Sequence, residues 1–275
     1  MLSAVPRSLR PGVALIIGSR AGRLVLHTGG ELIRVQIFDR SMTLAAQAFT
    51  SVFPLLIMLG ALFGPHARSW LVDRLSIPDT SARLLQEALT GSRSNAFGIV
   101  GSLIVVLSAT GLARALQRSY RAVWAVHGRA SGPAATGYQV VAMLLLVVFI
   151  VGTRLLDGTA ARSPAPLVAG AVVMFLADCA IAYLLPRVLV GPVVPRARLL
   201  TAAGVFALLM LGTRAAGSVY LPRALQASAD RYGVFGLAFT YIGWLYVLSF
   251  CLLLSGVLGR VLASPRREDH VTRAG

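Results

Sequence analysis

The stretch that decides the fold is SMTLAAQAFTSVFPLLIMLGALFG, residues 41–64, which is apolar over nearly its whole length. A helix of about 20 apolar residues is long enough to cross the hydrocarbon of a bilayer. Two residues do not suit a plain anchor, because Gln47 is polar and Pro54 removes a backbone hydrogen bond and bends a helix. Gly60 and Gly64 form a GxxxG pattern, which permits close helix packing. The stretch therefore predicts a bent, tightly packed transmembrane helix with one inward polar group.

The composition of the whole chain points to a membrane protein. Of its 275 residues, 56% are hydrophobic and only 13% are charged, which is too little charge to cover a soluble domain of this size. All 26 basic residues are arginine, and the formal net charge is +16. A charge of that size would also suit a nucleic-acid-binding protein, so the placement of the arginines has to decide between the two classes.

Six nearly uncharged windows predict an all-α polytopic membrane protein with six transmembrane helices. The windows are 41–67, 94–113, 130–153, 163–186, 199–213 and 232–259. The fifth reaches the length that a span requires by running past Arg214 to Leu221. We expect a transmembrane domain over 41–262, preceded by an interfacial or cytoplasmic segment 1–40 and followed by a cytoplasmic tail 263–275.

The arginines orient these helices with both termini in the cytoplasm. In that topology 17 of the 26 arginines lie in inner segments and nine in outer segments. The inner segments are 1–40, 114–137, 186–198 and 260–275, and the outer segments are 65–94, 154–162 and 214–231. This is the positive-inside distribution of membrane proteins. Topology thus explains most of the basicity, and we expect no binding to nucleic acid.

The N-terminal segment contains a helix signal outside the spans. Polar residues recur at steps of three and four, which places them on one helical face: Arg20, Arg23, His27, Glu31 and Arg34. The pattern predicts an amphipathic helix that lies on the inner membrane surface. An ordinary surface helix of a small cytoplasmic cap fits the same pattern.

The outer segment 65–94 is the longest connection between predicted spans. It holds helix-start residues at 78–81 and a stop at Gly91, which predicts one or two short helices near the outer surface. We favour a simple connector over a binding cap.

Polar side chains inside the spans form the candidate site. At about 1.5 Å per residue, five of them from four helices lie in the inner half of the bilayer: Gln47, Thr110, Arg114, Asp178 and Tyr246. A lone carboxylate at that depth is costly, so we expect Asp178 to face the interior and to contact Gln47 and at least one of the other three. Such residues mark a substrate or proton pathway by default. A structural hydrogen bond between helices is the alternative, and the sequence leaves both open.

A second charged group lies near the outer side. Arg154 and Arg214 come out about 23 Å from the inner ends of their helices, and Asp157 is placed to bridge both guanidinium groups. We favour the simpler interpretation, in which these side chains extend to the lipid headgroups.

No pattern typical of an enzyme or a metal site occurs. The sequence lacks HExxH, CxxC, a Walker loop and GxSxG, and its four histidines have no metal-ligand spacing. Cys179 and Cys251 fall in predicted spans, where cysteine is usually a small core residue. We therefore expect no catalytic residues, no metal and no cofactor.

Several short motifs occur in an order that is shared with a known family. They are DRSMTLAAQAF and SVFPLLIMLGALFG in the first span, Tyr183 to Pro186 in the fourth, and Tyr232, Gly233, Gly236, Trp244 and Tyr246 in the last. Together, over residues 39–262, they resemble the YihY/virulence factor BrkB family of bacterial inner-membrane proteins. Two positions depart from the family pattern: the first motif is about one turn shorter before Pro54, and Leu258 stands where the family has a glutamate.

The resemblance implies six spans, cytoplasmic termini and a role in envelope integrity. Transport or flipping of a lipid or small solute is the first hypothesis, supported by Asp178, Gln47 and the bent helix. A structural or scaffolding role is the second, and it predicts polar residues closed into hydrogen bonds between helices. The ribonuclease label that circulates for the family has no support in these residues. The sequence also leaves a homo-oligomer open.

Overall fold

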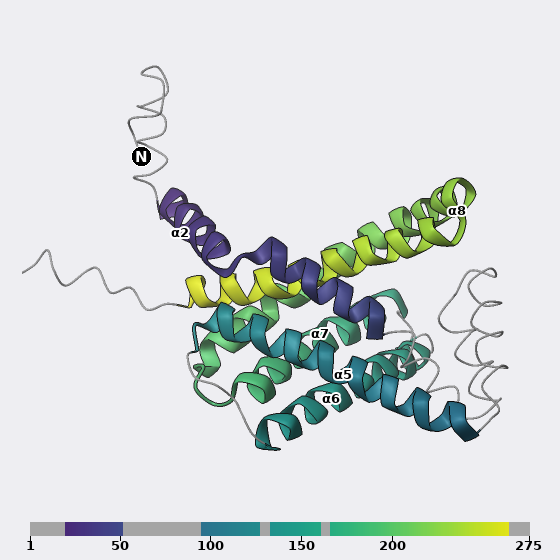
Figure 1. Ribbon diagram of the computed structural model, residues 1–275. Coiled ribbons are helices and arrows are strands. Elements are labelled where there is room, and N and C mark those ends of the chain that lie inside the picture. Colours follow the sequence, from purple (N-terminus) through teal and green to yellow (C-terminus); the bar gives the residue numbers. More distant parts are fainter. Residues whose placement is uncertain (1–19, 52–94, 127–132, 161–165, 264–275) are drawn as a thin grey trace, which may run out of the picture.

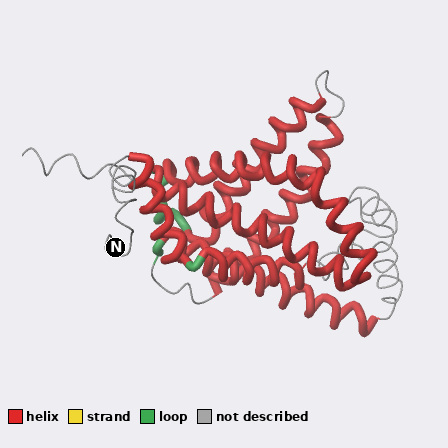
Figure 2. The backbone as a smooth tube through the Cα atoms, turned by 90° about the horizontal axis from the view of Figure 1, so that it is seen from above, coloured by secondary structure: helices red, strands yellow, loops and turns green. Residues whose placement is uncertain are grey.

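The structure, a computed structural model, describes residues 20–51, 95–126, 133–160 and 166–263, and this part of the chain is helical almost throughout (Figures 1 and 2). The helix α2 (Arg20–Val35) is followed by a helical segment over 37–51. The remaining helices are α5 (Asn95–Trp124), α6 (Pro133–Ala160), α7 (Pro166–Val190) and α8 (Arg196–Leu262). Within these residues the predicted all-α class is confirmed.

Three described helices are long and apolar enough to cross a membrane: Val168–Val190, Arg196–Gly233 and Phe235–Leu262. They coincide with the fourth, fifth and sixth predicted spans. The helices α5 and α6 occupy the second and third windows, and the segment 37–51 begins the first. A membrane protein is thus supported, whereas the count of six spans and the orientation stay predictions. Pro54, Gly60, Gly64 and the segment 65–94 lie outside the described residues.

The helix α8 consists of two antiparallel helices that meet at one residue. Gly233 has a φ of 58° and a ψ of −137°, a conformation that residues with a Cβ rarely adopt. Close approach between the two helices depends on glycine. A Cβ on Gly217 would lie 2.5 Å from the ring of Trp244, and one on Gly259 would lie 2.5 Å from the Cβ of Ala202. The fifth and sixth predicted spans therefore form a single hairpin.

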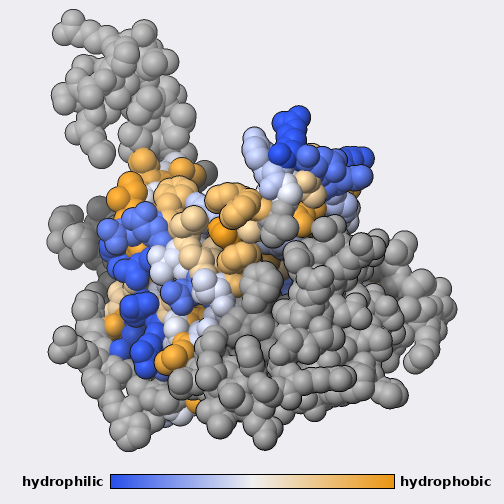
Figure 3. All heavy atoms as spheres, turned by 45° about the vertical axis from the view of Figure 1, so that its right-hand side comes forward, coloured by the Kyte–Doolittle hydropathy of each residue, from blue (hydrophilic) through white to orange (hydrophobic). Residues whose placement is uncertain are grey.

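The packed core lies at one end of the bundle. Both views show the helices converging where α2 and the last turns of α8 meet, and diverging toward the other end (Figures 1 and 2). Fully buried side chains gather at the converging end: Val35, Ile37, Leu44, Leu185, Leu199 and Leu253. On the face shown in Figure 3, hydrophobic side chains form a broad exposed area between two groups of hydrophilic ones. Such exposed apolar surface suits contact with lipid tails.

The helix α2 stands at the position predicted for the amphipathic helix. Val25, Leu26 and Ile33 are exposed on it. The helix ends at Val35, and Gln36, which has a φ of 54°, turns the chain into the segment 37–51. The Nε of Arg40 donates to the carbonyl of the last helical residue of α2 at 2.7 Å and holds this corner. Contact between α2 and a membrane surface stays a prediction.

Candidate functional site

The candidate site is an ion pair between α7 and α8. Asp178 on α7 is only 1% exposed. Arg214 on α8 donates from Nη2 to Asp178 Oδ1 at 2.8 Å and from Nη1 to Asp178 Oδ2. Both carboxylate oxygens thus have a charge-assisted partner, in the two-pronged geometry that matches guanidinium to carboxylate. The Arg214 side chain is itself 37% exposed, so the pair is closed on the Asp178 side and open on the other.

Helix geometry carries both residues toward the middle of the predicted bilayer. Asp178 precedes the end of α7 at Val190, and Arg214 follows the start of α8 at Arg196. At about 1.5 Å per residue, their Cα atoms lie roughly 18 and 27 Å from those ends. An arginine side chain in a helix leans toward the start of that helix. The Arg214 guanidinium therefore reaches back to the depth of Asp178, within a hydrocarbon layer of about 30 Å.

The pairing explains how an aspartate is tolerated at this depth. An ionised carboxylate without partners costs several kcal/mol or more in an apolar medium. A buried pair offsets that cost only when hydrogen bonds satisfy both groups, and Asp178 meets this condition through Arg214. A guanidinium has five N–H donors, and two of them bind Asp178. The open side of Arg214 can therefore offer donors to a second anionic group.

An apolar groove lies on the same two helices as the ion pair. Its volume is about 460 Å³, and its lining includes Val168, Val172, Phe175, Leu176, Leu208 and Leu211. Phe175 and Leu211 stand one helical turn before Asp178 and Arg214, respectively. Every side chain that lines the groove is apolar. The two helices thus place a hydrocarbon-compatible surface next to a charged group that is partly open.

The hydrogen-bond partner predicted for Asp178 was wrong. The carboxylate binds Arg214 and not Gln47 or the three other candidates. The depths predicted from the sequence were those of Cα atoms and did not include the length of the arginine side chain. Arg214 was therefore assigned to the outer charged group. The sequence did contain an indication of this pair. Arg214 is the single charge in the apolar run of the fifth predicted span, and this run packs antiparallel against α7. The side chains of Arg154 and Asp157 lie outside the described ones.

The other four predicted site residues do not join the ion pair. Gln47 lies against α5, where its Oε1 is 2.8 Å from the position of a Cβ on Gly111. Thr110 donates to a carbonyl one turn earlier on α5, at 2.9 Å. Tyr246 stacks on a phenylalanine of its own helix, with ring centroids 6.3 Å apart. Arg114 is exposed. The described structure therefore does not assemble these residues into one polar pathway.

A second charged cluster lies at the converging end of the bundle. Glu31 on α2 pairs with Arg34 at 2.7 Å and with Arg260 on α8 at 3.3 Å. The same arginines bind the last carbonyls of α5: Arg34 donates to Ala122 at 3.3 Å, and Arg260 donates to Val123 at 3.1 Å. Carbonyls at a helix C-terminus lack partners within the helix and favour positive charge. The cluster thus fastens α2 to α5 and α8, which the sequence pattern did not reveal.

The environment of Glu31 favours its charged form. Partial burial raises the pKa of its carboxyl, but the hydrogen bond from Arg34 and the positive charges of Arg260, Arg34 and His27 together outweigh that effect and hold the pKa below its ordinary value. At neutral pH Glu31 and its arginine partners are therefore ionised.

Among the described residues, the cysteines and the potential metal ligands do not form another candidate site. No three His, Cys, Asp or Glu side chains gather there in a way that could hold a metal ion. Cys179 lies 3.7 Å from the carbonyl oxygen of Ala203, and Cys251 lies 3.7 Å from the hydroxyl of Thr213. Both thiols are free and pack between helices.

Comparison with known proteins identifies one family. The family described as Virulence factor BrkB matches the chain over residues 29–274, which is nearly its whole length. The resemblance drawn from the short motifs is thereby confirmed. No curated protein and no solved structure matches the chain significantly.

Proposed function

The chain belongs to the virulence factor BrkB family, and we propose that this membrane protein supports the cell envelope by moving an anionic lipid or small solute across the bilayer. In this proposal it resides in the bacterial inner membrane with both termini in the cytoplasm. The lipid bilayer and the transported molecule are its partners. The helices α7 and α8 supply the central site.

The half-open ion pair is the observation that supports this function. Asp178 is enclosed and holds the guanidinium of Arg214 in place, while Arg214 stays 37% exposed. An incoming phosphate or carboxylate would bind the open donors of Arg214, and an attached hydrocarbon chain would lie in the apolar groove beside it. Asp178 and the substrate both present anionic oxygens that accept hydrogen bonds from a guanidinium. Arg214 therefore always has an anionic partner within the hydrocarbon layer.

A scaffolding role is the second candidate, and one observation favours it. Arg214 occupies both oxygens of Asp178, so the pair also acts as a closed link between α7 and α8. Under this alternative the pair contributes stability or helix register, and no molecule exchanges with Asp178.

Transport of a fluorescent phosphatidylglycerol by proteoliposomes tests the proposal. Wild type, Asp178→Asn, Arg214→Gln and the double variant are reconstituted, and quenching from outside reports how much labelled lipid crosses. We expect Arg214→Gln to reduce the transport rate at least tenfold. The double variant is expected to be stable and equally inactive, because it removes the anion-binding group together with its counter-ion.

The double variant also separates transport from scaffolding. Under the scaffolding alternative the pair acts only through stability or helix register, so Asp178→Asn combined with Arg214→Gln, once folded, should support the envelope as well as wild type does. Transport requires Arg214 itself. Lipid movement by the double variant at the wild-type rate would exclude the proposed role of the pair. Substitution of the exposed Arg114 by glutamine serves as the control for loss of one positive charge.

A further inference from the structure

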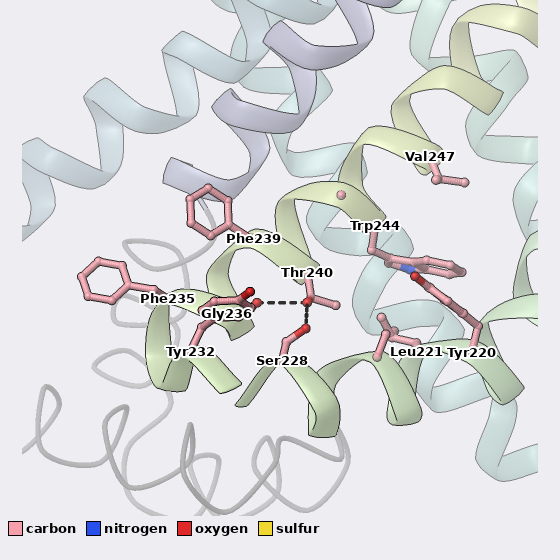
Figure 4. Close-up of a pocket in the computed structure, with 12 residues that line it drawn as sticks. Tyr220, Leu221, Ser228, Tyr232, Phe235, Gly236, Phe239, Thr240, Trp244 and Val247 are labelled. Atoms are coloured by element: carbon pink, nitrogen blue, oxygen red, sulfur yellow. Dashed lines mark hydrogen bonds between the residues drawn. The ribbon is translucent and has the colours of Figure 1, made fainter. Parts of the chain in front are cut away.

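The end of the α8 hairpin farthest from Arg260 contains a second and larger groove. Its volume is about 780 Å³, and the residues that line it include Tyr220, Ser228, Tyr232, Phe239, Thr240 and Trp244. Figure 4 shows these side chains on both helices of the hairpin, with Trp244 and Tyr220 on one side and Phe235 and Phe239 on the other. A groove of this volume lies in the range of ligand-binding pockets.

Large aromatic side chains that line the groove are exposed. Phe235 is 78% exposed, Phe239 73% and Tyr232 69%. Besides the polar groups of its tyrosines and tryptophan, the lining contains a pair of hydroxyl groups, Thr240 and Ser228, whose oxygens lie 2.8 Å apart. Hydroxyl oxygens retain acceptor and donor capacity beyond one bond. The groove thus combines a mainly aromatic wall with a small polar centre.

The depth of the groove relates it to the predicted bilayer. From Arg260, at about 1.5 Å per residue, Val247 lies roughly 20 Å away along the helix, Thr240 roughly 30 Å and Phe235 roughly 38 Å. The hydrocarbon layer is about 30 Å thick. If Arg260 marks the inner boundary, the outer boundary crosses the groove near Thr240. One part of the groove then faces acyl chains, and the other part reaches the headgroup layer.

Exposed arginines next in sequence to residues that line the groove favour an anionic headgroup. Arg231 directly precedes Tyr232, and Arg223 directly precedes Ala224, both of which line the groove; both arginines are exposed. Asp230 is the exposed acid in this stretch, which leaves a positive excess. Tyrosine and tryptophan prefer the membrane interface, and arginine near an anionic surface strengthens lipid binding.

We propose that this groove binds an anionic phospholipid of the outer leaflet, with an acyl chain along Trp244 and Val247 and the headgroup near Ser228, Arg223 and Arg231. The inference uses the predicted orientation but does not depend on transport through Asp178 and Arg214. A lipid bound here could equally serve a scaffold, so Arg214→Gln is expected to leave this binding unchanged.

Native mass spectrometry of the full chain with phosphatidylglycerol or phosphatidylcholine tests the groove. Gly243 lines it, and nothing lies within 4 Å of a Cβ placed there, so Gly243→Leu fills the groove without a backbone clash. We expect this variant to bind at least fivefold less phosphatidylglycerol than wild type does. Gly137→Leu is the matched control, because Gly137 is exposed on α6 and also has nothing within 4 Å of its Cβ position.

A second pair of variants tests the headgroup preference. Arg223→Gln and Arg231→Gln should each reduce the preference for phosphatidylglycerol over phosphatidylcholine by about fivefold, while binding of phosphatidylcholine persists. Unchanged lipid retention in Gly243→Leu would overturn the proposal. Loss of a dimer in that variant, with lipid retention unchanged, would also overturn it and would identify the groove as a contact between two copies of the chain. An unaltered headgroup preference in both arginine variants would remove the anionic specificity.

Discussion

Arg214 donates to both carboxylate oxygens of Asp178, although 36 residues separate them and only Asp178 is enclosed. The contact ties α7 to the first helix of α8 at mid-depth in the predicted bilayer. Since the tightly packed core lies at the converging end of the bundle, this pair is a polar link between helices in a region with less apolar burial. Its energetic role can be measured separately from any transport.

A double-mutant cycle on Asp178 and Arg214 should show favourable coupling. Asp178→Asn leaves the guanidinium without its counter-ion, and Arg214→Gln leaves an enclosed carboxylate. We expect each single change to destabilise the detergent-solubilised protein by about 1–3 kcal/mol, below the cost of breaking a fully buried pair because Arg214 is partly exposed. The double change should cost less than the sum of the two. Denaturation curves measure the three values, and strictly additive costs would contradict the coupling.

Gly259 should tolerate no side chain, whereas Gly212 should tolerate one. A Cβ on Gly259 would lie 2.7 Å from the backbone nitrogen of Ala202, and nothing lies within 4 Å of the position on Gly212. Because a backbone atom cannot move aside cheaply, Gly259→Ala should cost about 1–3 kcal/mol. Gly212→Ala should be neutral or slightly stabilising, since alanine favours helices more than glycine. Melting temperatures compare the two variants, and equal values would exclude the close approach at Gly259.

Much of this helical framework could be predicted from the sequence, but the pairing of charges could not. The windows at 163–186, 199–213 and 232–259 coincide with long apolar helices, because apolar length follows directly from the bilayer thickness. The partner of Asp178 was missed because an extended arginine reaches across more than one helical turn. The role of Glu31 was missed because its partner Arg260 lies on α8, and periodicity describes only one helix at a time.

Stability should fall at acidic pH through Glu31. Its pKa is held below the ordinary value in the folded protein, so its contribution is complete above the pKa of an unfolded glutamate, about 4.3. The contribution is lost as the pH falls through the lowered folded value. Glu31→Gln should therefore melt at a lower temperature than wild type near pH 7, and the gap should narrow as the pH falls below the pKa of an unfolded glutamate.

The control for Glu31 is Asp39→Asn, which changes an exposed acid on the neighbouring helical segment. This variant should follow the melting temperature of wild type near neutral pH. A Glu31→Gln variant that melts with wild type at every pH would show that the contacts with Arg34 and Arg260 contribute no stability.

The six-span topology can be tested with reporter fusions. The arginine distribution predicts that both termini are cytoplasmic and that Arg68 lies outside, whereas Arg129 lies inside. An alkaline phosphatase fusion after Arg68 should be active and one after Arg129 inactive, with the opposite result for a cytoplasmic fluorescent reporter. Activity of the same reporter at both positions would refute the predicted order of spans.

The turn at Gly233 has a consequence for biogenesis. The 67 residues of α8 contain two antiparallel helices with no loop between them, so the second helix starts to leave the ribosome as soon as the first is complete. Neither helix stays unpaired in the lipid until a distant segment is inserted, because its partner is the adjacent stretch of the nascent chain. The hairpin is therefore set up to enter the bilayer as one unit, with the contacts of Gly217 and Gly259 brought into register by the turn itself.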